Sequence, residues 1–331
     1  MRALLSVAPG GPERLRIEEV PDPEAGAGEL LVRVRACSIN YPDALIIEDK
    51  YQLKPGRPFA PGSEIAGEVI AVGAGVEDWT TGDRLIAATG YGGLAEKVVV
   101  PAIRAFRLPV ERSFDDGSAL LLTYATAIHA LADRGRLEPG QTLLVLGAGG
   151  GVGLAAAQTG KAMGARVIAA ASSEEKAAAA REAGADSAIV YPAGPFDRDG
   201  LRQLSQLFKD AVGPAGADVI LDPVGGDYSE AALRSIGWQG RFLVVGFPAG
   251  IARLPLNLTL LKSCDVCGVF WGAFAARQPE RNAAHVERLF AWWAEGKIAP
   301  KIGGRFTLER APEAIARLRD RKAVGKLVVT L

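Results

Sequence analysis

The chain has 331 residues, 49% of them apolar, and its 38 basic residues balance 38 acidic ones. A chain of this length can form two domains of ordinary size, and a zero net charge provides no field to attract nucleic acid. No uninterrupted apolar run reaches about 18 residues, the start resembles a strand rather than a signal peptide, and three cysteines make no disulfide framework. We therefore expect a cytoplasmic protein with no membrane partner.

The first 120 residues are predicted to be rich in β-strands. Residues 30–36 alternate apolar and polar side chains with a period of two, which is typical of a half-buried strand. Clusters of glycine and proline separate this segment from other short apolar runs. The further predicted strands are 1–7, 64–72, 84–88 and 95–100. This pattern predicts a mostly antiparallel, barrel-like domain.

Near residue 118 the pattern changes to strands that alternate with helices. The predicted strands are 143–146, 167–170, 187–190, 218–221 and 241–245. The predicted helices are 154–163, 174–183, 200–212 and 228–236. Strands joined by helices indicate a doubly wound parallel sheet, and the fold class is therefore α/β. A helix at 282–293 and a strand at 326–329 suggest that the chain then returns to the first domain.

A glycine-rich turn follows the first of these parallel strands. Residues 148–153 fit the pattern A-x-G-x-x-G, and a helix and a second strand follow within about 30 residues. Glycines at such a turn let the backbone approach a pyrophosphate, while the helix N-terminus supplies free N–H donors. We expect Gly150, Gly151, Val152 and Gly153 to bind a dinucleotide.

The end of the second parallel strand indicates which dinucleotide binds. An NAD site usually has an acidic residue there, but this chain has Ser172, Ser173 and, one helical turn later, Lys176. Two hydroxyls and an ammonium suit a 2′-phosphate, so the sequence favours NADPH. Ser172 and Glu175 also fit a helix capping box, and both interpretations can hold together.

The cysteines and histidines do not form a recognisable metal site. Cys264 and Cys267 form a C-x-x-C pair, but Cys37, His129 and His285 have no ligand spacing relative to them. We expect the cysteine pair to pack in a buried strand, the histidines to be packing or helix-surface residues, and no metal to be bound.

Residues 40–43 read Asn-Tyr-Pro-Asp, and residues 62–64 read Gly-Ser-Glu. The first segment is similar to the N-F/Y-x-D motif of the zinc-free NADPH:quinone oxidoreductases (zeta-crystallin-like), a branch of the medium-chain dehydrogenase/reductase superfamily that this chain resembles. Where zinc-dependent relatives carry a cysteine and a histidine ligand, this chain has Asn40 and Ser63. The resemblance implies a GroES-like β-barrel catalytic domain at 1–118, completed by 266–331, and a Rossmann NADP-binding domain at 119–265.

The resemblance also implies roles for individual residues. Tyr51 is the expected proton donor and Asn40 a second, neutral hydrogen-bond donor, whereas Asp43 is expected to order the loop rather than react. Leu45 replaces a second tyrosine found in some quinone reductases. Beside the glycine turn, Ser172, Ser173 and Lys176, the expected cofactor-binding residues are Asn40, Thr126, Tyr191, Gly246, Phe247, Phe270, Trp271 and Arg321.

Three functions remain open from the sequence. The first is NADPH-dependent hydride transfer to a quinone or another conjugated carbonyl, such as an enone or enal. The second is reduction of an enoyl thioester or a 2-alkenal by the same fold. The third is a non-catalytic nucleotide-binding protein with a structural or RNA-binding role. The family resemblance further implies a homodimer, formed through the apolar run 266–271 at the edge of the sheet.

Overall fold

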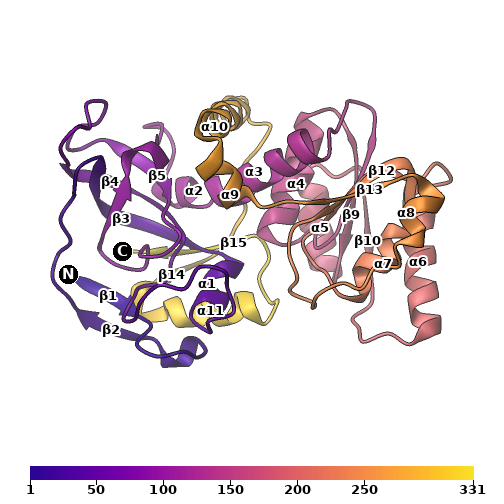
Figure 1. Cartoon of the computed structure of the whole chain (residues 1–331), viewed down its shortest axis with the longest axis horizontal. Helices are drawn as coiled ribbons and strands as arrows, with labels where there is room; N and C mark the ends of the chain where they lie inside the picture. The colour runs from indigo at the N-terminus through magenta and orange to yellow at the C-terminus, as the bar shows by residue number, and fades with distance from the viewer. The chain divides into compact units, whose positions relative to one another are not determined.

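The computed structural model describes all 331 residues, which divide into two compact units (Figure 1). Unit 1 comprises Met1–Leu122 and Pro300–Leu331, and unit 2 comprises Thr123–Ala299. The first boundary lies four residues from the one expected at 118. The return to unit 1 begins at Pro300 and not near residue 266, because the intervening strand pairs with the sheet of unit 2.

Unit 1 contains a seven-stranded sheet with the order β14-β15-β3-β4-β5-β7, in which β6 also pairs with β3. Its pairings are antiparallel except for β14 with β15, so the prediction of a mostly antiparallel domain is confirmed. A separate antiparallel pair is formed by β1 and β2. The strands are β1 (Arg2–Leu5), β2 (Arg16–Glu19), β3 (Glu29–Ile39), β4 (Glu64–Val72), β5 (Arg84–Ala88), β6 (Lys97–Pro101), β7 (Ala105–Arg107), β14 (Ile302–Thr307) and β15 (Lys326–Thr330).

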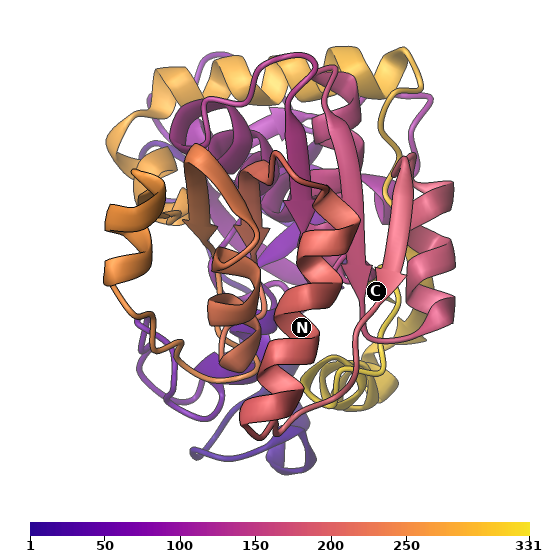
Figure 2. The same cartoon turned by 90° about the vertical axis from the view of Figure 1, so that its right-hand side faces the viewer.

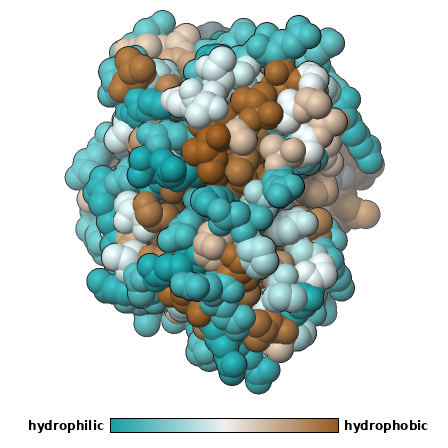
Figure 3. All heavy atoms as spheres, turned by 90° about the vertical axis from the view of Figure 1, so that its left-hand side faces the viewer, coloured by the Kyte–Doolittle hydropathy of each residue, from teal (hydrophilic) through white to brown (hydrophobic).

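Alternating side chains of β3 build much of the core of unit 1. Leu30, Val32 and Val34 are buried, whereas Arg33 between them is exposed, which is the periodicity that predicted the strand. Short helices complete the unit: η1 (Pro12–Arg14), α1 (Tyr41–Ile46), η2 (Ala102–Arg104), α2 (Phe114–Ser118), η4 (Leu308–Arg310) and α11 (Ala311–Arg319). The face of the molecule seen in Figure 3 is largely hydrophilic, with several patches of apolar side chains.

Unit 2 contains a six-stranded sheet with the order β10-β9-β8-β11-β12-β13, in which all pairs are parallel. The predicted doubly wound sheet is confirmed. The strands are β8 (Thr142–Val145), β9 (Arg166–Ala171), β10 (Ser187–Val190), β11 (Ala217–Asp222), β12 (Ile236–Val244) and β13 (Asp265–Gly268). Because all six strands run the same way, their carboxyl ends lie along one edge of the sheet, where such folds bind ligands.

Helices cover the sheet of unit 2, and α6 stands in front of it in Figure 2. Its buried residues Leu204 and Phe208 pack into one cluster with Ile168 and Ile220 of the strands. None of the helices in the structure is both long and apolar enough to cross a membrane. The helices are α3 (Leu121–Ile128), the π-helical turn η3 (His129–Arg134), α4 (Gly151–Ala162), α5 (Glu174–Glu182), α6 (Arg198–Val212), α7 (Asp227–Leu233), α8 (Asn257–Lys262), α9 (Trp271–Arg277) and α10 (Pro279–Ala294).

One strand of unit 2 differs from its prediction. The apolar run around the C-x-x-C pair was expected to be buried, but β13 is the last strand of the sheet and is largely exposed. Cys264 is buried and Cys267 is only partly buried. An edge strand has no neighbour on its outer side, so apolar composition alone overestimates its burial.

Candidate functional site

The glycine turn after β8 requires glycine at two positions, at one for its backbone conformation and at the other for lack of space. Gly147 has a φ of +59°, a left-handed conformation that disfavours other residues. A Cβ on Gly153 would lie 2.3 Å from the carbonyl oxygen of Gly147. Helix α4 begins directly after Gly150, which provides no side-chain cap, so the N–H groups of its first turn are available to a phosphate.

Lys176 lies directly against this glycine turn. A Cβ on Gly149 would lie 2.4 Å from the Cβ of Lys176, so the absence of a side chain at Gly149 lets the start of α5 approach the turn. The ammonium of Lys176 is 3.3 Å from the hydroxyl oxygen of Ser172 and donates a hydrogen bond to it. A hydroxyl and an ammonium thus lie together on the segment that packs against the turn.

The N-cap residue of α5 differs from the one in the capping box that the sequence offered, which paired Ser172 with Glu175. Ser173, and not Ser172, is the N-cap residue, and its hydroxyl accepts the backbone N–H of Lys176 at 3.3 Å. The hydroxyl of Ser172 is therefore not used as a cap. Glu174 forms an ion pair with Arg181, which reduces the repulsion that its carboxylate would exert on a bound phosphate.

The loop after β11 is organised by a buried carboxylate. Asp222 accepts hydrogen bonds from the backbone N–H groups of Val224 (2.8 Å) and Gly225 (2.9 Å) and from the hydroxyl of Ser229. Burial raises the pKa of Asp222, and these hydrogen bonds oppose that rise. Backbone hydrogen bonds join this loop to residues 246–250, so two of the loops at the carboxyl edge hold each other in place.

The remaining predicted residues of unit 2 differ in exposure. Phe247 and Phe270 follow β12 and β13 and are 48% and 56% exposed, so their rings are accessible to a ligand. Trp271 is buried, and its indole N–H donates to Asn282 at 2.8 Å.

Two other predicted residues of unit 2 are buried. Thr126 lies on α3 and is 8% exposed. Tyr191 follows β10 and packs its ring against Tyr228, with the ring centres 5.0 Å apart. Gly246 belongs to the loop after β12 described above. The structure thus brings most of the predicted cofactor residues of unit 2 to the carboxyl edge of one sheet.

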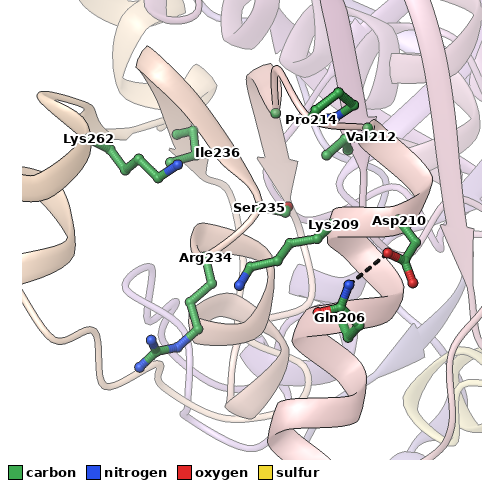
Figure 4. A pocket seen from close by; sticks show the side chains of 11 residues that line it. Gln206, Lys209, Asp210, Val212, Pro214, Arg234, Ser235, Ile236 and Lys262 are labelled. Carbon is green, nitrogen blue, oxygen red and sulfur yellow. Dashed lines mark hydrogen bonds between the residues drawn. The ribbon is translucent and has the colours of Figure 1, made fainter.

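A hollow of about 490 Å³ lies at the opposite edge of the same sheet (Figure 4). It is lined by residues at or before the starts of β11, β12 and β13, and Lys209, Arg234 and Lys262 extend around it. None of the residues predicted to bind the cofactor lines this hollow.

In unit 1, the turn that carries the Asn-Tyr-Pro-Asp motif is held by a buried aspartate. Asp43 accepts the backbone N–H of Asn40 at 2.7 Å in a capping box at the start of α1. It also accepts the backbone N–H of Gly62 (3.1 Å) and the hydroxyl of Ser63 (3.3 Å). Burial raises the pKa of Asp43 to about 6, although its hydrogen bonds oppose this. Asp43 therefore orders the loop, as expected.

The side chain of Asn40 lies between two buried charges. Its Nδ2 group donates to Oε2 of Glu64 (3.1 Å) and to the carbonyl oxygen of Ser38 (3.3 Å), and its Oδ1 accepts from the ammonium of Lys326. The amide has two hydrogens, and both have acceptors in the protein. The direct donor role expected of Asn40 does not fit this arrangement.

Glu64 and Lys326 were not assigned a role from the sequence. Glu64 begins β4 and is fully buried, and Lys326 begins β15 and is 4% exposed. Their charged groups are 3.2 Å apart. A lysine at the start of an otherwise apolar strand was the only signal in the sequence, and it does not indicate a partner.

Tyr51 and Arg321 are the other predicted residues of unit 1. Tyr51 is partly buried and packs against the core. Burial raises its pKa, and the charge of Asp43 raises it further, so the phenol keeps its proton at neutral pH. Arg321 lies in the turn after α11, with a φ of +59°.

Ser63 and Asn40, which the resemblance places at the ligand positions of zinc-dependent relatives, are engaged with protein groups. Ser63 binds Asp43, and the oxygen of Asn40 binds the ammonium of Lys326. No three His, Cys, Asp or Glu side chains in the structure are arranged to hold a metal ion.

A mostly antiparallel unit with a parallel, glycine-turn unit inserted in it is the architecture of a two-domain dehydrogenase or reductase. Two family models match the chain: an alcohol dehydrogenase GroES-like domain over residues 26–110 and a zinc-binding dehydrogenase over residues 151–288. The quinone oxidoreductase-like protein 2 of Rattus norvegicus is 36% identical over 96% of this chain and 89% of that protein.

Solved structures agree with this assignment. A mycobacterial protein complexed with NADPH has a TM-score of 0.92 and 30% identity, and each chain is covered completely. The quinone oxidoreductase of Escherichia coli complexed with NADPH has a TM-score of 0.91 and 27% identity, also with both chains fully covered. The chain belongs to the quinone oxidoreductase family of the medium-chain dehydrogenases/reductases.

Proposed function

We propose that this protein is an NADPH-dependent reductase that transfers hydride to a quinone or another conjugated carbonyl compound without zinc. The observation that carries the proposal is the position of Lys176 and Ser172 beside the glycine turn. NADPH-bound relatives of the same fold support a nicotinamide nucleotide as cofactor.

The residues at the carboxyl edge of the unit 2 sheet fit NADPH. Gly149 and Gly153 leave room that a Cβ would fill, and the N–H groups at the start of α4 suit the pyrophosphate. Lys176 and Ser172 suit the 2′-phosphate, which distinguishes NADPH from NADH. When bound, NADPH supplies the hydride.

In unit 1, Tyr51 is the proposed hydrogen-bond and proton donor to the carbonyl oxygen of the substrate. Reduction of a conjugated carbonyl places negative charge on that oxygen, and a positioned donor stabilises it. The raised pKa of Tyr51 keeps its proton available at neutral pH. A zinc-free mechanism agrees with the ammonium of Lys326, which binds the oxygen of Asn40 and would repel a divalent cation.

The first test compares cofactors. Oxidation of NADPH and NADH is followed by absorbance with a 1,4-naphthoquinone, an enone, a 2-alkenal and a short enoyl-CoA. Lys176→Ala should weaken NADPH binding by about 10- to 100-fold, the equivalent of one charge-assisted hydrogen bond, and leave NADH unaffected. Lys209→Ala, at the opposite edge of the sheet, is the matched control. If Lys176→Ala kept the wild-type preference for NADPH over NADH, the assignment of Lys176 to the 2′-phosphate would be refuted.

The second test concerns the donor. Tyr51→Phe should lower kcat by about 100-fold, as loss of one oxyanion donor does elsewhere, while the Kd for NADPH stays constant. Wild-type turnover in Tyr51→Phe would show that solvent supplies the proton. No turnover with any acceptor, with NADPH still bound, would argue against the reductase assignment.

A further inference from the structure

The buried cluster of unit 1 contains an ion pair whose carboxylate, Glu64, also accepts the hydroxyl of Ser38 and the backbone N–H of Leu122, both at 2.7 Å. Glu64 and Lys326 form an ion pair with both side chains at most 5% exposed. Removing two charges from water costs free energy that their attraction repays only partly, so an apolar pair of similar size often stabilises a protein as well or better. Buried ion pairs are better explained where they fix one arrangement among several.

The arrangement fixed here is the orientation of the Asn40 amide. An amide group can rotate by 180° and exchange its oxygen with its nitrogen. At Asn40, the ammonium of Lys326 can donate only to the amide oxygen, and the carboxylate of Glu64 can accept only from the amide nitrogen. Lys326 and Glu64 together therefore allow a single orientation.

The orientation of Asn40 is linked to the turn that leads toward Tyr51. Asn40 is the N-cap of α1, and its backbone N–H is bound by Asp43. Asp43 in turn holds Gly62 and Ser63, and its charge acts on Tyr51. A chain of contacts thus runs from Lys326 through Asn40 to Asp43.

We propose that Lys326 is a positioning residue of the reductase: with Glu64 it locks the amide of Asn40 and thereby the turn that carries Asp43. This inference rests on the function proposed above. It assigns Asn40 an indirect role, because both of its amide hydrogens are used within the protein.

The electrostatics of the cluster give the proposal a readout that a purely structural role lacks. The titratable groups that face Asp43 are Cys37, Tyr51 and Lys326, and Glu64 faces Cys37 and Lys326. The charge of Lys326 lowers the pKa of Asp43 against the larger effect of burial. Loss of that charge would raise the pKa of Asp43 and weaken its three hydrogen bonds at neutral pH.

The test uses a variant that removes the charges as a pair. Lys326→Met alone leaves Glu64 as an unpaired buried anion and is expected to fold poorly. The double variant Glu64→Gln with Lys326→Met keeps the volume and leaves no unpaired charge. Lys322→Met, which alters an exposed lysine just before β15, is the matched control.

We expect the double variant to keep wild-type affinity for NADPH and to lose at least tenfold in kcat. The acidic limb of its activity profile should lie at higher pH, because Lys326, and not Glu64, is among the main influences on the pKa of Asp43. Lys322→Met should match the wild type in all three. A folded double variant with wild-type kcat and pH profile would overturn the proposal. Absence of wild-type turnover with every acceptor would instead count against the proposed function.

A measurement on the wild-type protein tests the same proposal without activity. The chain has three asparagines, so selective ¹⁵N labelling gives three side-chain amide signals. The Asn40 amide should exchange its hydrogens slowly and show two well-separated proton shifts. Exchange as fast as that of an exposed amide would overturn the proposed lock, whether or not any variant folds.

Discussion

Asp43 makes the stability of the protein depend on pH in a direction opposite to that of most carboxylates. Burial is the largest influence and raises its pKa from 3.8 to about 6. The folded state therefore holds the proton more tightly than the unfolded state. The stabilisation associated with this proton is complete below about pH 4 and is lost as the pH rises through 6. A shift of about two units corresponds to about 3 kcal/mol.

The perturbation that isolates this effect is Asp43→Asn, which resembles the protonated aspartate and does not titrate. Urea unfolding followed by far-UV circular dichroism gives the free energy of unfolding of both proteins between pH 4 and 8. Relative to the variant, the wild type should lose about 3 kcal/mol across this range, a large part of the total stability of a typical domain. Other titrating groups are common to both proteins and cancel in the difference.

Asp78→Asn is the matched control because Asp78 is an exposed aspartate of the same unit. It should follow the pH dependence of the wild type. Parallel curves for the wild type and Asp43→Asn would refute the reasoning, since they would mean that the buried carboxyl binds its proton equally well in both states.

Three further outcomes are expected. Gly153→Ala should weaken NADPH binding by about 10- to 100-fold, because its Cβ would lie 2.3 Å from a backbone oxygen. The control Gly56→Ala places its Cβ in open space and should leave the Kd for NADPH, measured by titration, unchanged. If the proposed homodimer forms through the exposed edge strand β13, Val266→Lys should yield monomers by sedimentation velocity; an unchanged mass would exclude that edge. Of the thiols, partly buried Cys267 should react first with Ellman's reagent, and Cys37, whose pKa burial raises, only on unfolding; early labelling of Cys37 would contradict its burial.

The sheet of unit 2 could be predicted because its signals are local. An apolar run, a glycine turn and a helical segment identify a strand–helix unit wherever it occurs in a chain. The predicted strand 187–190 has the bounds of β10, and 64–72 and 84–88 have those of β4 and β5. The residues that follow each parallel strand then share one edge by geometry alone, which is why Ser172 could be placed at this edge from the sequence, whereas Phe247 was named from the family resemblance.

The polar cluster of unit 1 could not be predicted, because its partners are far apart in the chain. Lys326 lies 286 positions from Asn40 and 262 from Glu64. They meet because β15 pairs with β3 and β3 with β4. That sheet order depends on the whole fold and not on any local pattern. The exposure of β13 was missed for the same reason, since an apolar segment does not reveal whether it will have one neighbouring strand or two.

The buried carboxylates of the two units follow a common logic. Asp43 and Asp222 each accept two backbone N–H groups and one serine hydroxyl. Burial nevertheless raises the pKa of both, so the folded state would hold either group more easily as a neutral acid. Neither carboxylate is therefore explained by the stability that its charge provides. An ionised carboxylate offers more acceptor positions than a neutral side chain of the same size, and so it can hold several N–H groups of a loop at once. Burial of each carboxylate lowers the stability of the protein, and its hydrogen bonds fix the geometry of a loop. Proteins tolerate such a loss of stability where a ligand or a reacting group has to be positioned.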